Sequence, residues 1–221
     1  MRIKFDEQLR QLNSEMVLMC NMIEKAIQEA IDALFTRNVE KARQIMKDDE
    51  LVDQEQKKIE NICFQLLVQQ QPVARDLRTI TAAMKMVTDM ERIGDHAADI
   101  SELTVMMADS PSIRKAERIR KMAAEAVIML LQAVEAYVER DMKKARDVIA
   151  HDDIVDDLFV KVKADLIEIM QTDTAYAEYA ADLLMVNKYL ERIADHATNI
   201  AEWVIFSING RLDDRVSSNE S

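Results

Sequence analysis

Apolar residues recur every three or four positions along most of the chain, and charged residues fill the positions between them. One such stripe consists of Met90, Ile93, Ala97 and Ile100. This spacing is typical of amphipathic α-helices that bury one face. The pattern predicts six long helices, which cover residues 3–36, 39–69, 73–109, 111–139, 142–171 and 175–208. Because the connectors are short, consecutive helices are expected to pack antiparallel in an all-α fold.

Residues with defined roles at helix ends mark several of these boundaries. Asn38 and Asp141 are good N-cap residues, since their side-chain oxygens accept hydrogen bonds from free backbone amides. Pro72 is expected to open the third helix, where its missing N–H has little effect. Ser110 followed by Pro111 predicts the same arrangement at the start of the fourth helix.

The chain is internally duplicated. Residues 38–53 align with residues 141–156 at a separation of 103, and residues 91–100 align with residues 191–200 at a separation of 100. The second copy therefore lacks three residues between these landmarks, and the shorter connector near residues 172–174 is the natural place. The duplication predicts two tandem antiparallel three-helix bundles. The first domain is placed at residues 1–109, the second at 110–208 and a polar tail at 209–221.

Composition supports the helical prediction and restricts the class of partner. With two Gly and two Pro, the chain has too few turn residues for a β-rich fold. Hydrophobic residues make up 49% of the chain but aromatic residues only 5%, which predicts an aliphatic core rich in methionine. The formal net charge of −12 opposes binding to nucleic acid or to an anionic membrane surface. A cation or a basic protein surface is better matched.

The sequence also predicts a cytoplasmic location. Cys20 and Cys63 lack any C-x-x-C spacing and are expected to be buried thiols in a reducing compartment. The first residues are too charged for a signal peptide. Direct insertion into a membrane is not expected, because acidic and amide side chains interrupt the most apolar stretch, residues 122–138.

Acidic pairs spaced four residues apart are the main candidates for chemistry. At this spacing two carboxylates stack one helical turn apart. Their repulsion destabilises the helix by about 0.2–0.5 kcal/mol per pair. The pairs fall in two duplicated sets, Asp49/Asp53 with Glu91/Asp95 and Asp152/Asp156 with Glu191/Asp195.

Two interpretations of these pairs remain open. A cation would offset the repulsion, and carboxylates suit hard ions such as iron(III), manganese, calcium or magnesium. Alternatively, the pairs form a solvated acidic face that Arg92 and Arg192 relieve.

The histidines are expected to lie outside this face. His96 and His196 follow the acidic pairs by one residue, which is 100° around the helix, so they are predicted to pack or to support ligands. His151 has an aspartate as its counterpart in the first copy and is expected to be incidental. No catalytic nucleophile with an adjacent base is present, so the chain is not expected to be an enzyme.

Two motifs of the chain resemble those of the PhoU family, regulators of bacterial phosphate uptake. Residues 91–95, Glu-Arg-Ile-Gly-Asp, and 191–195, Glu-Arg-Ile-Ala-Asp, are similar to the duplicated signature of that family. Residues 71–78, Gln-Pro-Val-Ala-Arg-Asp-Leu-Arg, resemble the segment that opens its third helix. The resemblance implies two three-helix bundles whose surface E/D-x-x-x-D motifs hold multinuclear iron or other metals.

The resemblance also implies a function. The implied function is negative regulation of phosphate uptake and of phosphate-starvation signalling. The protein would act as an adaptor to the phosphate ABC transporter and its sensor histidine kinase. Self-association as a homodimer is a further expectation. The acidic faces are not expected to bind phosphate directly, because they would repel an anion. The expected metal ligands are Asp49, Asp53, Glu91, Asp95, Asp99, Asp152, Asp156, Glu191, Asp195 and Asn199.

Two other classes of function are weighed against this one. A metal store or di-metal carboxylate protein of the ferritin type would need carboxylates that project into the bundle. A plain helical scaffold would bind no metal. Within the metal hypothesis the two sites are expected to be unequal, because Asn199 replaces Asp99 and Lys163 replaces Glu60 in the second copy.

Overall fold

The computed structural model describes residues 2–70, 72–110 and 117–211, and these residues form helices and no strands. The helices are α1 (Arg2–Thr36), α2 (Val39–Gln70), α3 (Ala74–Met106), α4 (Glu117–Glu139), α5 (Met142–Thr172) and α6 (Ala177–Asn209), with a short 3₁₀ helix, η1 (Thr174–Tyr176), before α6. The predicted all-α class is confirmed. No helix in the described part of the chain is both long enough and apolar enough to cross a bilayer.

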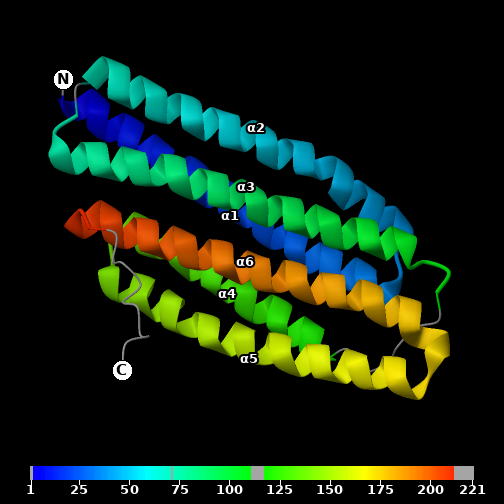
Figure 1. Ribbon diagram of the computed structural model, residues 1–221. Helices are drawn as coiled ribbons and strands as arrows, with labels where there is room; N and C mark the ends of the chain where they lie inside the picture. The colour runs from blue at the N-terminus through cyan, green and yellow to red at the C-terminus, as the bar shows by residue number, and fades with distance from the viewer. Residues whose placement is uncertain (1, 71, 111–116, 212–221) are drawn as a thin grey trace, which may run out of the picture.

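The six helices form two adjacent three-helix bundles, α1–α3 and α4–α6 (Figure 1). The duplicated helices α3 and α6 lie side by side and antiparallel at the centre of the molecule (Figure 1). Helices α1 and α4 also contact each other across the boundary between the bundles. Equivalent residues of the two copies therefore meet where α3 and α6 cross.

The core is aliphatic, as the composition predicts. The stripe of Met90, Ile93, Ala97 and Ile100 is fully buried, and so is its counterpart on α6. Cys20 is also buried, and burial is the main cause that raises the pKa of its thiol to about 12. A thiol with so high a pKa is scarcely ionised at neutral pH and is therefore a weak nucleophile. Both cysteines are thus packing residues, as expected.

Two of the predicted helix caps are present. The backbone amide of Lys41 donates a hydrogen bond to Asn38 Oδ1 at 3.0 Å. Asp141 accepts hydrogen bonds from the amides of Lys143 and Lys144 at the start of α5. Each cap satisfies amides that have no partner within the helix.

The prediction for Pro72 was wrong in its position. Helix α3 begins at Ala74 with Val73 as its N-cap, so Pro72 precedes the helix instead of opening it. Proline biases the residue before it, not the residue after it, towards extended backbone, so it did not fix where the helix begins. The predicted cap at Ser110–Pro111 extends into residues 111–116, which lie outside the described residues, as does the tail beyond residue 211.

Candidate metal site

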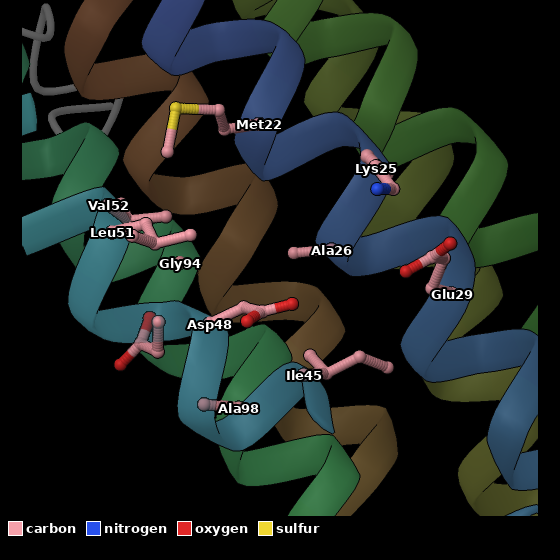
Figure 2. A pocket seen from close by; sticks show the side chains of 11 residues that line it. Met22, Lys25, Ala26, Glu29, Ile45, Asp48, Leu51, Val52, Gly94 and Ala98 are labelled. Carbon is pink, nitrogen blue, oxygen red and sulfur yellow. The ribbon is translucent and has the colours of Figure 1, made fainter. Parts of the chain in front are cut away.

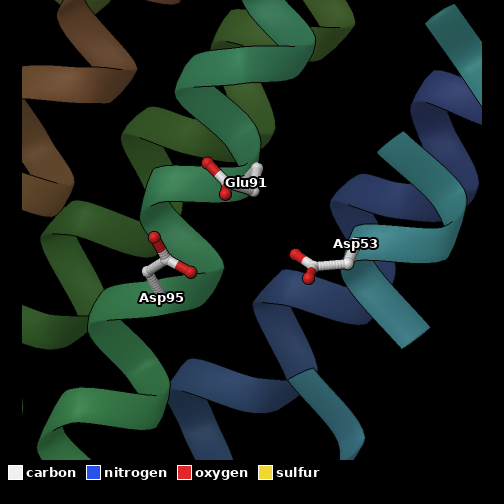
Figure 3. Close-up of side chains that lie close together, drawn as sticks. All are labelled: Asp53, Glu91 and Asp95. Carbon is white, nitrogen blue, oxygen red and sulfur yellow. The ribbon is translucent and has the colours of Figure 1, made fainter. Parts of the chain in front are cut away.

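The first acidic set comes together on the surface between α2 and α3. Asp53 projects from α2 towards Glu91 and Asp95, which stack one turn apart on α3 (Figure 3). One carboxylate oxygen from each residue lies within 4.8 Å of the other two. Among the described residues, no other group of three Asp, Glu, His or Cys side chains has ligand atoms this close. We call these three residues the first acidic site.

The carboxylates in and around the first acidic site repel one another. Burial and the charges of Asp95, Asp53, Glu91 and Asp99 raise the pKa of Asp49 to about 6. Burial and Asp95 raise the pKa of Glu91 as well. An added cation would therefore be stabilised at the site.

Arg92 neutralises part of the negative charge of the first acidic site, as the interpretation of a solvated acidic face predicts. Its Nη1 atom lies 2.9 Å from Asp95 Oδ2, and its Nε atom lies 3.5 Å from Glu91 Oε2. More than half of the Arg92 side chain is exposed, so water screens these ion pairs. One screened guanidinium against five carboxylates leaves an excess of negative charge, which the raised pKa values of Asp49 and Glu91 reflect.

Gly94 allows α2 to approach α3 beside the first acidic site. A Cβ atom at Gly94 would lie 3.1 Å from Val52 Cγ1 and 3.4 Å from Asp49 Oδ1. The first distance is shorter than ordinary carbon contacts. Gly94 lines a recess of about 110 Å³ between α1, α2 and α3 (Figure 2). The second copy has Ala194 at this position and so carries the methyl group that the first copy lacks.

The second acidic set is arranged differently. Lys188 forms an ion pair with Glu191, and its Nζ atom lies 5.6 Å from the centre of the Phe159 ring on α5. Burial and Glu191 raise the pKa of Asp195, while Lys188 opposes that shift. The charge of Asp156 also acts on Asp195, so α5 and α6 do bring these carboxylates near each other. A lysine ammonium therefore already offsets part of their charge.

A polar groove of about 720 Å³ lies between α3 and α6 and connects the two copies. His96 and His196 meet there with ring centres 5.7 Å apart. His96 Nδ1 lies 3.2 Å from Asp99 Oδ2, and His196 Nδ1 lies 2.8 Å from Asp89 Oδ1. Both histidines thus hydrogen-bond to carboxylates and pack at the centre, the role expected of them.

Two of the expected site residues, Asn199 and Asp99, form hydrogen bonds in the groove between α3 and α6. Asn199 donates a hydrogen bond from Nδ2 to Asp89 Oδ1 at 3.2 Å, so its amide nitrogen is directed across the groove to α3. Asp99 accepts a hydrogen bond from His96. Asp152 lies half-buried on α5. His151, which was expected to be incidental, pairs with Glu125 at 2.8 Å and links α5 to α4.

Sequence reasoning missed Asp89 and Lys188. Their counterparts in the other copy are Tyr189 and Thr88, so comparison of the two copies did not single them out. Lys188 precedes Glu191 by three residues, and this helical spacing alone was sufficient to predict the ion pair.

The donor set of the first acidic site fits a hard cation. It consists of carboxylate oxygens alone, which suit iron(III), manganese, magnesium or calcium better than zinc. The donors are half-buried at the surface, whereas the interior of each bundle is almost entirely apolar. This position argues against a ferritin-type centre, whose ligands project inward from facing helices.

Comparison with known families identifies the duplicated unit. The PhoU domain matches twice, at residues 16–104 and at residues 119–204. A phosphate-specific transport system accessory protein PhoU homolog from Clostridium acetobutylicum is 38% identical over 211 residues, which cover 95% of this chain and 96% of that protein. A homolog with the same description from Burkholderia sp. is 30% identical over 210 residues, which cover 94% of this chain and 89% of that protein.

Solved structures share the whole fold. The crystal structure of PhoU from Pseudomonas aeruginosa superposes with a TM-score of 0.88 at 29% sequence identity, covering 94% of this chain and 100% of that one. The structure of the phosphate transport system regulatory protein PhoU from Streptococcus pneumoniae gives a TM-score of 0.87 at 25% identity, with 95% and 99% covered. The arrangement of the two bundles is therefore common to this chain and these proteins.

Proposed function

The chain belongs to the PhoU family, and from that premise we propose that it is an accessory regulator of phosphate transport. The observation that carries this proposal is the match of both halves of the chain to the PhoU domain, together with nearly complete coverage of relatives named for phosphate transport. Those names describe an accessory protein and no reaction, which agrees with a role that is not enzymatic.

The finer role we propose is that of a negative regulator in the cytoplasm. It represses phosphate-starvation genes when phosphate is plentiful, as an adaptor between the phosphate ABC transporter and its sensor histidine kinase. The long exposed faces of α2 and α5 provide surface for such contacts and for assembly as a homo-oligomer. An acidic surface favours partners with a basic one.

We also propose that the first acidic site holds a metal ion, with iron as the first candidate. Its support is the group of three carboxylates with repulsion that Arg92 relieves only in part. Asp53, Glu91 and Asp95 would be the ligands, and Asp49 and Asp99 would add charge nearby. The ion would join α2 to α3 and would thereby fix the surface that partners meet.

Deletion of the gene tests the regulatory role. We expect the deletion strain to express a phosphate-starvation phosphatase in phosphate-rich medium at the level of starved cells, because the repressing contact is lost. The phosphatase is measured with a reporter, and the intact gene supplied on a plasmid should restore repression. A deletion strain in which the reporter stays repressed in rich medium would contradict the proposal.

A further inference from the structure

Three arginines gather at one end of the molecule, within and beside the motif at residues 71–78 that the metal site does not use. Arg75 and Arg78 lie in the first turns of α3, and Arg140 follows the end of α4. The end of α6 lies at the same end of the molecule (Figure 1). We call Arg75, Arg78 and Arg140 the arginine cluster.

Contacts between α3 and α4 place Arg140 in the cluster. Arg140 adopts a left-handed backbone conformation, with φ at 57°, in the turn between α4 and α5. Its Nη1 atom donates to Thr79 Oγ1 at 3.1 Å, and the Tyr137 hydroxyl donates to the Thr79 carbonyl at 3.4 Å. Thr79 is one helical turn beyond Arg75 and directly follows Arg78, so the three guanidinium groups are brought to one side of α3.

Arg78 is held against the end of α6 without a hydrogen bond at Nε. A Cβ atom at Gly210 would lie 3.3 Å from Arg78 Cδ and 3.4 Å from Nε, which shows how closely the two pack. The Nε atom of Arg78 is buried and has no hydrogen-bond partner. A buried donor without a partner lowers the stability of the folded chain, and an acceptor placed there would remove that cost.

The positive charges of the cluster are balanced only in part. Within the described residues, none of the three guanidinium groups forms an ion pair with a carboxylate. Burial and the charges of Arg75 and Arg78 lower the pKa of Arg140, although Asp76 opposes the shift. The start of α3 adds positive potential, because its first-turn amides have no side-chain cap.

The fold itself does not require this cluster. The equivalent positions of the second copy are Ala175, in η1, and Glu178, on α6, so Arg37, the counterpart of Arg140, is the one member of the cluster that the second set of positions repeats. Arg37 instead donates to the Ser110 carbonyl and lies 5.7 Å from the centre of the Tyr179 ring. The arginine cluster is therefore a specialisation of one end of a duplicated structure.

We propose that the arginine cluster and the first turn of α3 bind a tetrahedral oxyanion of the phosphate class. A phosphate group presents acceptor oxygens in several directions, which suits donors that converge from α3 and from the turn after α4. A helix N-terminus adds backbone N–H donors and favourable potential for the anion. The site takes either free inorganic phosphate or the phosphoryl group of a larger molecule such as a nucleotide.

The acidic faces do not prevent this binding. Arg78 and Asp95 are 17 residues apart on α3, which corresponds to about 25 Å along the helix. Charges at the surface are largely screened beyond about 8 Å at physiological ionic strength. The expected repulsion of anions therefore applies to the acidic faces and does not extend to this end of the molecule.

Calorimetric titration of the full chain tests the proposal. The metal-free protein is titrated with inorganic phosphate and, separately, with ATP, both at matched ionic strength. We expect Arg75→Gln and Arg78→Gln each to weaken binding about tenfold or more, because each removes charge-assisted hydrogen bonds. Arg75 is exposed, so its substitution leaves the fold intact. Arg43→Gln, an exposed arginine near the start of α2, is the matched control and should change the affinity less than twofold.

The two titrations also identify the source of the oxyanion. Binding of inorganic phosphate by itself indicates the free ion, whereas binding of ATP alone indicates a phosphoryl group on a larger molecule. The proposal is overturned when neither probe binds at millimolar concentration, or when the Arg75 and Arg78 variants bind as tightly as the control. Neither result depends on the regulatory role proposed above.

Discussion

Replacement of Asp95 by alanine should lower the affinity for manganese(II) about 100-fold, whereas the same change at Asp195 should have a much smaller effect. Loss of groups that only support metal ligands reduces affinity roughly 10- to 100-fold, so loss of a ligand belongs at the upper end of that range. Asp95 belongs to the one close group of three carboxylates in the described residues. Asp195 belongs to a set that the Lys188 ammonium already balances in part.

The difference between the two sites has several physical sources. Glycine at position 94 lets Asp49 and Val52 of α2 lie close to α3, whereas Ala194 carries a Cβ atom at the equivalent place. Asn199 has one oxygen, no charge and an amide nitrogen bonded to Asp89. Because the affinity for hard cations rises with the number of charged oxygen ligands, each difference favours the first site.

Calorimetry and the metal content of the purified protein measure this prediction. Asp147→Ala is a suitable control, because Asp147 is an exposed carboxylate that pairs only with Lys143 at 2.8 Å in the described structure. It should leave the affinity unchanged. Equal losses from the Asp95 and Asp195 variants, or a greater loss from the second, would contradict the inequality of the sites. No loss in either variant would contradict the metal site itself.

The helices could be predicted closely because their signals are local. The apolar stripe that contains Met90 and Ile93 depends only on helical periodicity, and both residues are fully buried. Asn38 and Asp141 act on amides within three residues, so their roles followed from sequence position. Pro72 was misplaced because a proline is compatible with positions both before and inside the first turn.

The candidate site was predictable in its parts but not in its assembly. The duplication placed Asp49 and Asp53 in one set with Glu91 and Asp95, but only the packing of α2 on α3 shows that Asp53, and not Asp49, completes the close group of three. The partners of His196 and Asn199 could not be predicted, because Asp89 reaches them from the other copy across the α3–α6 groove. Contacts between distant segments depend on tertiary packing, which periodicity does not encode.

The stability of the metal-free protein should fall as the pH rises from about 4 to about 6, and Asp49 should account for a large part of the change. The pKa of Asp49 is raised from 3.8 to about 6 in the folded state, so between these values the folded chain binds more protons than the unfolded one. Stability must then decrease with increasing pH. The full shift corresponds to about 3 kcal/mol, but Asp49 is half-exposed, and solvent screening reduces the expected effect to about 1 kcal/mol.

Asp49→Asn should therefore stabilise the metal-free protein by about 1 kcal/mol at pH 7 and have little effect at pH 4, because the amide is neutral at both. The free energy of unfolding is measured by urea denaturation at a series of pH values after removal of metal. Asp48→Asn is the matched control, since Asp48 is exposed and accepts a hydrogen bond from Gln44 at 2.7 Å. If both variants show the same dependence on pH, burial and the neighbouring carboxylates do not act on Asp49 as the structure indicates. Added manganese(II) should reverse the trend for the wild-type chain, because it binds the ionised carboxylates and so adds stability as the pH rises.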